Sequence, residues 1–482
     1  MNTPPPREPP LRRGMLLAFV LPAIMLGFMH APEMQVQGIY AKYSGLSLTA
    51  LAGAVLLTRM FDAFTYPLIG HWSDASFRRS GSRKAWILAG TVVTVAGLWF
   101  LYRPPAGVSI TYFTLCMATT YVGWKLTEIP YSAWSLSLTR DYTQRVRVQL
   151  WRAMAVMIGA LVFYAVPYGA KLLGLAADTE LNLQSLALTA VVVVVCVPLL
   201  NLYSLARVPD GEAPPAAPPS QRPGVRELLR ALAGNGPLLR LLAALLPAVF
   251  LTGMSGGVTY LYVDSYMHLG KQLALILLVS TPFTLLGLPF WGWMCLKFER
   301  HRVWSVALLL SALGYAGMGF APPGEAGLYP ILVLYSLSVF CVVSIGVTAP
   351  AMMGDILDYD RLRTGEDRAG MYSAILAFLT KSMLGVSGAL GLAVVGWFGF
   401  DAKGGEQSLL GVFGIKLVAV WLPTLGLALG APIIWNFPIN RARQEQIRQA
   451  IHSRDAALAG TTRMDPAEAA GSSDRMDAGT TS

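Results

Sequence analysis

Charge is scarce in this chain. Only 13% of its 482 residues are Asp, Glu, Lys or Arg, whereas 54% are hydrophobic. A soluble globular domain usually carries about 25% charged residues. The composition therefore excludes a chain that folds mainly in water, and it predicts that most of the backbone lies in a lipid bilayer.

Several kinds of functional site are also missing from the sequence. It shows no phosphate-binding loop, no zinc-ligand cluster and no nucleophile elbow between a strand and a helix. Its four cysteines, Cys116, Cys196, Cys295 and Cys341, are scattered through apolar stretches without metal-ligand spacing. We therefore expect no enzymatic activity, no cofactor, no metal site and no disulfide.

Long apolar runs are what the chain has instead. A helix needs about 20 mostly apolar residues to cross a hydrocarbon core of about 30 Å. The sequence predicts twelve such helices, at residues 15–34, 46–72, 85–102, 110–136, 151–171, 184–204, 239–267, 272–296, 303–321, 327–353, 369–398 and 409–434. The predicted fold class is an all-α polytopic membrane protein.

A polar, proline-rich stretch divides these runs into two sets of six. Residues 206–238 include PDGEAPPAAPPSQRPG and are too polar to cross a membrane. We interpret them as a linker between an N-terminal bundle at 15–205 and a C-terminal bundle at 239–435. Residues 1–14 form a short tail, and we expect 436–482 to be a disordered tail because its last part is small, polar and mixed in charge.

Lys and Arg are concentrated in alternate loops, which predicts that these loops lie in the cytoplasm. Both termini and the linker would then be cytoplasmic, in the plasma (bacterial inner) membrane. This bias also accounts for most of the formal net charge of +10. We therefore expect membrane lipids as partners and no nucleic acid.

Charged side chains inside the predicted spans are the unusual feature. Each costs about 2.5–3.5 kcal/mol in lipid, so each should face the protein interior and a partner. Asp264 and Lys416 lie near span ends, where we expect them to reach toward the membrane surface. The deeper ones are Arg59, Asp62, Lys125, Glu128, Arg152 and Lys381.

Two spans carry a polar stripe on one helix face. In the second span the stripe consists of Arg59, Asp62 and Tyr66, and Asp62 lies about 18 Å of helix away from the loop residue Asp74, near the middle of the bilayer. In the fourth span the stripe consists of Tyr121, Trp124, Lys125 and Glu128. Such stripes are typical of the wall of a polar cavity. An inert salt-bridge network is the alternative, although buried ion pairs contribute little net stability.

Several motifs resemble those of a known family. GHWSDASFRRSGSRKAW, after the second span, resembles the loop motif of the major facilitator superfamily. RMFDAFTYPLIGHWSD resembles the second-helix signature of the glycoside-pentoside-hexuronide:cation symporters within it. EIPYSAW at 128–134 and GDILDYDRLRTGEDRAGMYSA at 354–374 match in order. The resemblance covers nearly the whole chain and implies two pseudo-symmetric six-helix bundles that work by alternating access.

The resemblance also implies roles for individual residues. At the position of Asp62 the family binds its coupling cation, and Lys381 lies close to that site. At the position of Glu128 the sugar and cation sites meet, and at that of Arg152 the family contacts sugar. We expect Arg59 and Lys381 to be internal counter-charges of cation coupling.

Two departures from the family pattern bear on substrate and ion. Where the family has a second aspartate in the second helix, this chain has Tyr66. A Na⁺ site needs several oxygen ligands, whereas a proton needs one titratable group, so we predict H⁺ coupling or facilitated diffusion over Na⁺. The family's first-helix carboxylate, which grips sugar, is also missing, because the first span has no acid before Glu33.

Polar and aromatic side chains near these positions are the candidate substrate contacts. They are Glu128, Arg152, Tyr121, Trp124, Lys125, Trp134 and Tyr372. The aromatic ones would stack on a sugar ring face.

A second group of charges predicts a gate on the cytoplasmic side. Asp74, Arg78, Arg79, Arg83 and Lys84 follow the second span, and Asp355, Asp358 and Asp360 precede the eleventh. The two groups could clamp the halves together. Ordinary inside-positive loop charge is the alternative for the basic residues.

The sequence thus predicts a monomeric, cation-coupled symporter of a glycoside, hexuronide or related sugar. A lysolipid or other amphiphile carrier, and a proton-driven exporter, would share the fold and the charges. From a different class, a membrane sensor or assembly factor would bind a ligand or partner without flux.

Overall fold

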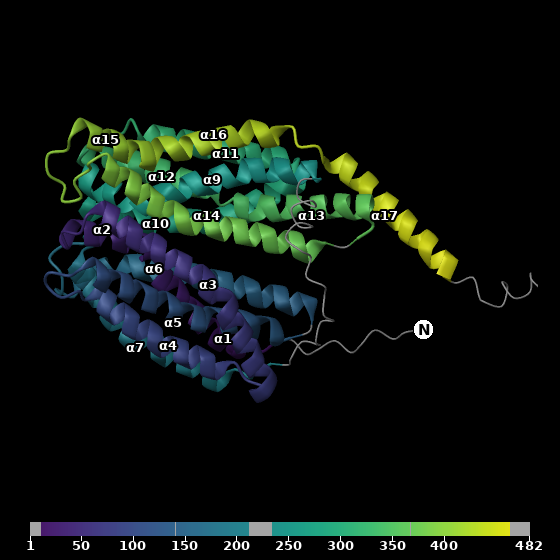
Figure 1. The fold of residues 1–482 in the computed structure, drawn as a ribbon, viewed down its shortest axis with the longest axis horizontal. Coiled ribbons are helices and arrows are strands. Elements are labelled where there is room, and N and C mark those ends of the chain that lie inside the picture. The colour runs from purple at the N-terminus through teal and green to yellow at the C-terminus, as the bar shows by residue number, and fades with distance from the viewer. Residues whose placement is uncertain (1–10, 140, 212–233, 367, 463–482) are drawn as a thin grey trace, which may run out of the picture.

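A computed structural model of the chain describes residues 11–139, 141–211, 234–366 and 368–462, and these form helices and loops without a strand. The N-terminal half consists of α1 (Arg13–His30), α2 (Glu33–Tyr43), α3 (Leu48–Ser80), α4 (Lys84–Tyr102), α5 (Ile110–Ser137), α6 (Tyr142–Leu172) and α7 (Leu183–Arg207). The C-terminal half consists of α9 (Gly236–Leu261), α10 (Gly270–Lys297), α11 (Arg300–Met318), α12 (Leu328–Val342), α13 (Ile345–Thr364), α14 (Ala369–Trp397), α15 (Leu409–Lys416) and α16 (Leu422–Trp435), followed by α17 (Arg441–Thr462). The halves form two bundles, one above the other in Figure 1.

All twelve predicted spans fall on helices, but the predicted span 327–353 is divided between α12 and α13, and α13 runs on to Thr364. Ten stretches of the described residues are long and apolar enough to cross a membrane. The predicted spans 110–136 and 303–321 form α5 and α11, which are not among these ten. The all-helical architecture is confirmed, and the count of twelve membrane crossings stays a prediction.

Small residues let neighbouring helices approach closely. Gly97 of α4 and Gly123 of α5 each face a threonine of the other helix, and a Cβ atom at Gly123 would lie 2.4 Å from the backbone nitrogen of Thr94. In the C-terminal half, Gly257 of α9 faces Gly388 of α14 in the same way. Lipid provides little hydrophobic drive for helix association, so such close contacts supply much of the packing energy.

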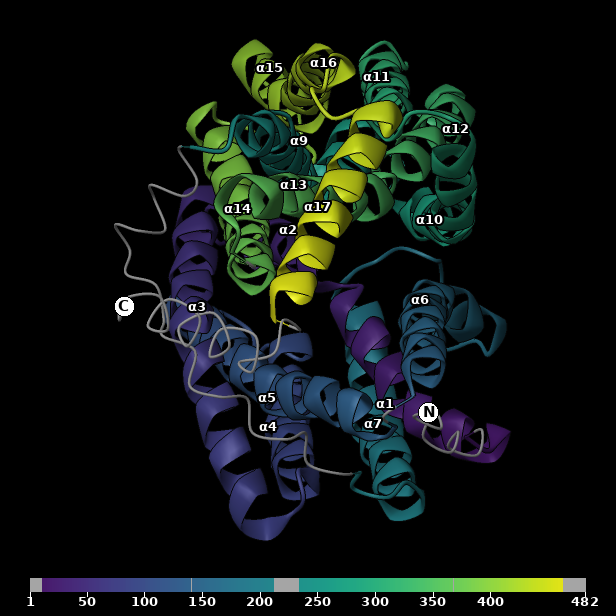
Figure 2. The same ribbon diagram turned by 90° about the vertical axis from the view of Figure 1, so that its right-hand side faces the viewer.

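Among the described residues, the most extensive helix contacts between the two halves are those of α2 with α9, α3 with α14, and α6 with α10. We call the end of the molecule that holds the α3–α4 loop and α17 the basic end, and the other end the opposite end. The basic end lies to the right in Figure 1 and faces the viewer in Figure 2.

Helix α9 ends in a π-helical turn, Tyr262–Tyr266, which carries Asp264. The expectation that Asp264 reaches toward the membrane surface is wrong, because this residue is only 5% exposed and is paired inside the protein. Lys416 also turns inward, where its ammonium donates to the carbonyl of Gly319 at the end of α11, at 3.1 Å.

Helix α17 occupies part of the predicted disordered tail, so that expectation is wrong for residues 441–462. The helix packs on α13 of the C-terminal half. Ile447 and Ile451, one turn apart, are its buried contacts, at 2% and 6% exposure. Polar bonds to α13 accompany them, such as the side-chain amide of Gln444, which donates to Asp358 at 2.6 Å. The composition of this segment shows its polar residues but not the apolar face that they flank.

Other predicted segments lie partly outside the described residues. These are 1–10 of the N-terminal tail, 212–233 of the linker and 463–482 of the C-terminal tail. The helices that flank the linker end at Arg207 and begin at Gly236.

Candidate functional site

The first predicted span, 15–34, is interrupted near its end, at residues 31–32. α1 ends at His30 and α2 begins at Glu33, yet together they form one stretch, Arg13–Tyr43, that is long enough to cross a membrane. Pro32 precedes α2 and has no N–H with which to continue the hydrogen-bond ladder of α1. The candidate membrane stretch Arg13–Tyr43 therefore runs beyond the predicted span 15–34, and Glu33 lies within this stretch rather than at its end.

Glu33 contacts side chains of three other helices. Its carboxylate accepts a hydrogen bond from the guanidinium of Arg59 on α3. The ring of His30 on α1 and the hydroxyl of Tyr121 on α5 each lie 3.2 Å from its oxygens. The side chain is 14% exposed, and its place in the first turn of α2 favours a negative charge there.

Lys125 of α5 lies between two carboxylates. Its Nζ atom is 3.8 Å from Oδ2 of Asp62 on α3 and 3.4 Å from Oε2 of Glu128. The other oxygen of Asp62, Oδ1, is buried and has no hydrogen-bond partner among the described residues. The polar stripes of the second and fourth predicted spans therefore face each other.

Tyr66 lies beside two lysines. The Nζ atom of Lys381, on α14, is 3.5 Å from the Tyr66 hydroxyl and 4.7 Å from the centroid of its ring. The Nζ atom of Lys125 is 5.4 Å from the same centroid. The phenol thus takes part in two cation–π contacts where the resembling family has a carboxylate.

We call these charged side chains and His30 the central cluster. Its members are His30, Glu33, Arg59, Asp62, Lys125, Glu128 and Lys381. The formal charges balance when His30 is neutral. Binding one proton or one ionic ligand therefore leaves an uncompensated charge in a mostly buried site, and the side chains must rearrange to meet it.

The aromatic residues of the α5 stripe pack within the protein. The rings of Tyr121 and Trp124 are parallel within 4°, with centroids 6.2 Å apart. The ring of Trp124 also lies against His30. Both aromatic residues are only 3% exposed. In this conformation they therefore pack against the central cluster, and their ring faces are not open to a substrate.

Arg152 of α6 lies next to the cluster. Its guanidinium donates to the hydroxyl of Ser132 at 2.6 Å and lies over the ring of Tyr131. Ser132 follows Glu128 by four residues on α5, so a ligand at Glu128 lies about one helical turn from this arginine.

The structure places two other predicted substrate contacts away from the cluster. Trp134 is buried and donates from its indole nitrogen to the carbonyl of Pro209, at 2.8 Å. Tyr372 is also buried and interacts with Asn235 near the basic end. It precedes Lys381 by nine residues of α14, or about 14 Å.

Lys42, near the end of α2, joins the two halves at the opposite end. Its Nζ atom lies 2.8 Å from Oε1 of Glu180 in the α6–α7 loop and 2.9 Å from Oδ2 of Asp264 in the C-terminal half. We call Lys42, Glu180 and Asp264 the opposite-end triad. Nearby, Gln37 of α2 donates to the carbonyl of Gly257 on α9, at 2.9 Å.

The predicted gate residues pair within their own halves. Asp74 pairs with Arg83 at 3.1 Å, and Asp355 pairs with Arg300 at 2.6 Å. Lys84 pairs with Asp210 at the start of the linker, and Asp358 pairs with Arg448 of α17. Arg78 and Arg79 are exposed. The clamp between halves is thus not formed in this conformation. Arg83 keeps two buried nitrogens, Nε and Nη1, without a partner among the described residues.

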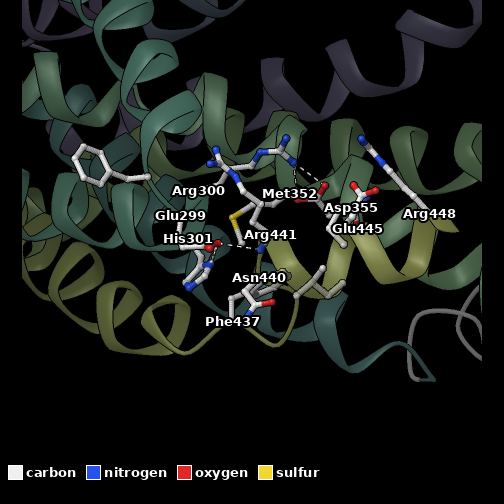
Figure 3. Close-up of a pocket in the computed structure, with 13 residues that line it drawn as sticks. Glu299, Arg300, His301, Met352, Asp355, Phe437, Asn440, Arg441, Glu445 and Arg448 are labelled. Carbon is white, nitrogen blue, oxygen red and sulfur yellow. Dashed lines mark hydrogen bonds and ion pairs between the residues drawn. The ribbon is translucent and has the colours of Figure 1, made fainter. Parts of the chain in front are cut away.

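A pocket at the basic end lies between α11, α13 and α17 (Figure 3). Its charged side chains largely satisfy one another. Arg300 pairs with Asp355, and the backbone N–H of Arg441 donates to Glu299 at 3.1 Å. Apart from Asp355, the predicted site residues do not line it. We interpret this pocket as the seam along which α17 docks on the C-terminal half.

Comparison with known proteins identifies the family. A family model described as MFS/sugar transport protein matches residues 15–441. The chain belongs to this family. The resemblance drawn from the second-helix and loop motifs is thereby confirmed, and the protein is a multi-pass membrane transporter rather than an enzyme.

Three known proteins illustrate this relationship. The glucuronide carrier protein homolog of Escherichia coli K12 is 22% identical over 433 residues, covering 86% of this chain and 90% of the relative. The human sodium-dependent lysophosphatidylcholine symporter 1 is 22% identical over 474 residues, covering 89% and 84%. The xylose transporter XylE of E. coli, solved in an inward-open conformation, has a TM-score of 0.57 at 15% identity, covering 90% of this chain and 99% of that one. At this identity the solved structure shows a shared fold alone.

Sequence reasoning missed the roles of Glu33 and Lys42. Both lie on α2, whose sequence EMQVQGIYAKY is too polar to be taken for membrane-embedded helix. Gln35 and Gln37 are nevertheless 6% and 3% exposed, because this segment is covered by protein. The Pro32–Glu33 pair directly after an apolar run was the available signal, since proline marks a helix start.

Proposed function

We propose that this transporter carries a glycoside or hexuronide in symport with a proton, by alternating access to the central cluster. In this proposal Asp62 and Glu128 take part in coupling, and Arg59 and Lys381 are their counter-charges. The basic end is cytoplasmic, as the distribution of Lys and Arg predicts. The protein works as a monomer in the bacterial inner membrane.

The position of Lys125 favours a proton over Na⁺ as the coupling ion. Its ammonium already lies between Asp62 and Glu128, so a Na⁺ ion at Asp62 would meet a positive charge and would also need several further oxygen ligands. A proton needs only one oxygen atom. The buried Oδ1 of Asp62, which has no partner among the described residues, is such an atom.

The same geometry links proton binding at Asp62 to substrate binding at Glu128. Protonation of Asp62 removes one of the two negative charges next to Lys125, so Lys125 then pairs with Glu128 alone. Glu128 is the residue expected to contact sugar. The charge state of Asp62 therefore changes how Glu128 is held, which is the differential interaction that coupling requires.

Arg152 and the relatives support a sugar substrate. A guanidinium one turn from a carboxylate can hold the hydroxyls of a glycoside, or pair with the carboxylate of a hexuronide. A relative at 22% identity is named a glucuronide carrier protein homolog. These observations favour a sugar with several hydroxyls or one negative charge.

Uptake of labelled glycosides and hexuronides into proteoliposomes tests the proposal. We expect uptake to follow an inward proton gradient and to fall to the background of protein-free vesicles in Asp62→Asn. Glu325→Gln, a matched change at an exposed turn, should keep wild-type uptake. Proton-driven uptake that persists in Asp62→Asn would contradict the coupling role.

An amphiphile carrier is the second candidate, because another relative at 22% identity is named a lysophosphatidylcholine symporter. If no sugar moves under a proton or sodium gradient, the same vesicles should be tested with labelled lysophospholipid. Extrusion of substrate would identify an exporter, and ligand binding without flux would identify a sensor.

A further inference from the structure

Arg59 lies close to two carboxylates that belong to different helices. It donates to Glu33 on α2, and Asp62 follows it by one turn on the same face of α3. Two buried polar atoms in this group have no hydrogen-bond partner among the described residues, namely Nε of Arg59 and Oδ1 of Asp62. One is a donor and the other an acceptor, so a turn of the guanidinium toward Asp62 can satisfy both.

The first membrane stretch packs on different helices before and after Glu33. α1 packs on α6 and α7 of its own half, whereas α2 packs on α9 of the other half. Glu33 lies in the first turn of α2, and Lys42 of the opposite-end triad lies in its last turn. A change of charge at Glu33 therefore acts on the rigid segment that seals the opposite end.

We propose that Arg59 switches between Glu33 and Asp62, and that protonation of Glu33 drives the switch and loosens the seal at the opposite end. This inference rests on the proton coupling proposed above. In the switch, the Glu33 carboxylate takes up one proton and forms an O–H bond. Arg59 keeps its charge and turns to Asp62, so α2 loses its ionic tie to α3.

By reciprocity, opening of the opposite end raises the proton affinity of Glu33. A proton then enters from the side to which that end opens. The Arg59–Glu33 pair re-forms when the proton leaves and the end seals. Glu33 thus acts as a second coupling carboxylate, in place of the one that Tyr66 does not supply.

Other titratable and charged groups around Glu33 also have to be considered. They are His30 on α1, Arg59 and Asp62 on α3, Tyr102 on α4, and Tyr121 and Lys125 on α5. Of these, the imidazole of His30 lies 3.2 Å from a Glu33 oxygen and can exchange a proton with solvent. The experiment therefore needs a His30 variant beside the Glu33 variants.

Distances between spin labels at Ala177→Cys and Glu406→Cys report the seal. These exposed positions lie in loops of the two halves at the opposite end, and the four native cysteines are replaced. The purified full-length protein is measured in nanodiscs from about pH 8 to about pH 5, without substrate or gradient. Sugar uptake is not read here, so a failed symport proposal and a failed switch are told apart.

We expect the open population of the wild type to rise as the pH falls. Glu33→Gln should raise the open-to-sealed ratio about tenfold at high pH and abolish its pH dependence. Glu33→Asp and His30→Gln should keep that dependence, and Glu325→Gln should change nothing. Wild-type pH dependence in Glu33→Gln would overturn the proposal.

A double-mutant cycle separates the switch from a simple structural ion pair. If Arg59 is shared, the effects of Glu33→Gln and Asp62→Asn on the open-to-sealed ratio are coupled, because each variant removes the alternative partner of the other. We expect a departure from additivity of about tenfold. Additive effects would show that Arg59 serves Glu33 alone and would overturn the switch.

Discussion

The two ends of the molecule are held by different kinds of contact. At the opposite end, side chains of one half bond to the other half. Lys42 pairs with Asp264, whose side chain is 1% exposed, and Tyr260 donates to the carbonyl of Leu181 at 2.9 Å. The side chains of Asp264 and Tyr260 are buried.

At the basic end, the gate residues bond within their own halves. Asp74, with 54% of its side chain exposed, pairs with Arg83 of the N-terminal half, and Asp355 pairs with Arg300 of the C-terminal half. Several of these charges are exposed and could find other partners in another conformation.

The two ends therefore differ in how much free energy their ion pairs contribute to the closed conformation of each end. Breaking a buried ion pair by removing one partner costs about 3–5 kcal/mol, whereas an exposed pair is worth about 0–1 kcal/mol. We infer that the opposite-end triad dominates the balance between states. The basic end then contributes smaller, adjustable amounts.

Removing the lysine of the triad should have the largest effect. Lys42→Ala leaves Asp264 buried without its counter-charge, so the sealed state should lose about 3 kcal/mol. The open-to-sealed ratio should then rise on the order of a hundredfold, measured with the spin labels at Ala177 and Glu406. Lys403→Ala, at an exposed position of the same end, is the control. An unchanged distance distribution in Lys42→Ala would mean that helix packing alone maintains the seal.

Glu180 should contribute less and should give the seal a defined pH limit. Burial alone would raise the pKa of Glu180, but hydrogen bonds from Lys42 and Tyr43 outweigh it and lower the pKa. A lowered carboxyl pKa means that its stabilisation is complete above the ordinary Glu range and is lost as the pH falls through the lowered value.

Glu180→Gln should therefore weaken the seal at neutral pH by about 1 kcal/mol or less, because this side chain is partly screened by water. The difference between the variant and the wild type should shrink as the pH falls below the ordinary Glu range, because the wild-type carboxyl then becomes protonated. The same pair of labels measures it. A difference that grows as the pH falls would refute this sign.

The smallest effect is expected at the basic end. If the predicted clamp forms when that end closes, Asp74→Ala should favour the state open at the basic end by about twofold to fivefold. Labels at the exposed residues Ser80 and Gln449 would show the shift, with Glu445→Gln as the control. If the distances do not shift, the basic residues act only as the positive loop charge that sets the membrane topology.

Much of the fold and part of the site could be predicted from the sequence. The helices follow from apolar runs that alternate with polar loops. Asp62, Lys125 and Glu128 could be brought together because charges at helical spacing in lipid must face a partner. The structure places these three side chains next to one another, as that argument expects.

The rest could not be predicted, because hydropathy measures exposure to lipid and not burial in protein. α2 is polar where it packs on α9, so the predicted span 15–34 ended just after Glu33 and left Lys42 outside. Trp134 and Tyr372 belong to the right helices, but their depth along the helix axis separates them from the cluster. Residue type alone does not give that depth.

The π-helical turn that carries Asp264 affects how relatives should be compared with this chain. A π turn contains one residue more than an α turn, so every side chain after Tyr262 is rotated relative to an uninterrupted helix. An alignment with a relative that lacks this turn needs a one-residue gap within Tyr262–Tyr266. Without the gap, a matching carboxylate in the relative would be assigned to the wrong face of its helix, and a shared triad would be overlooked.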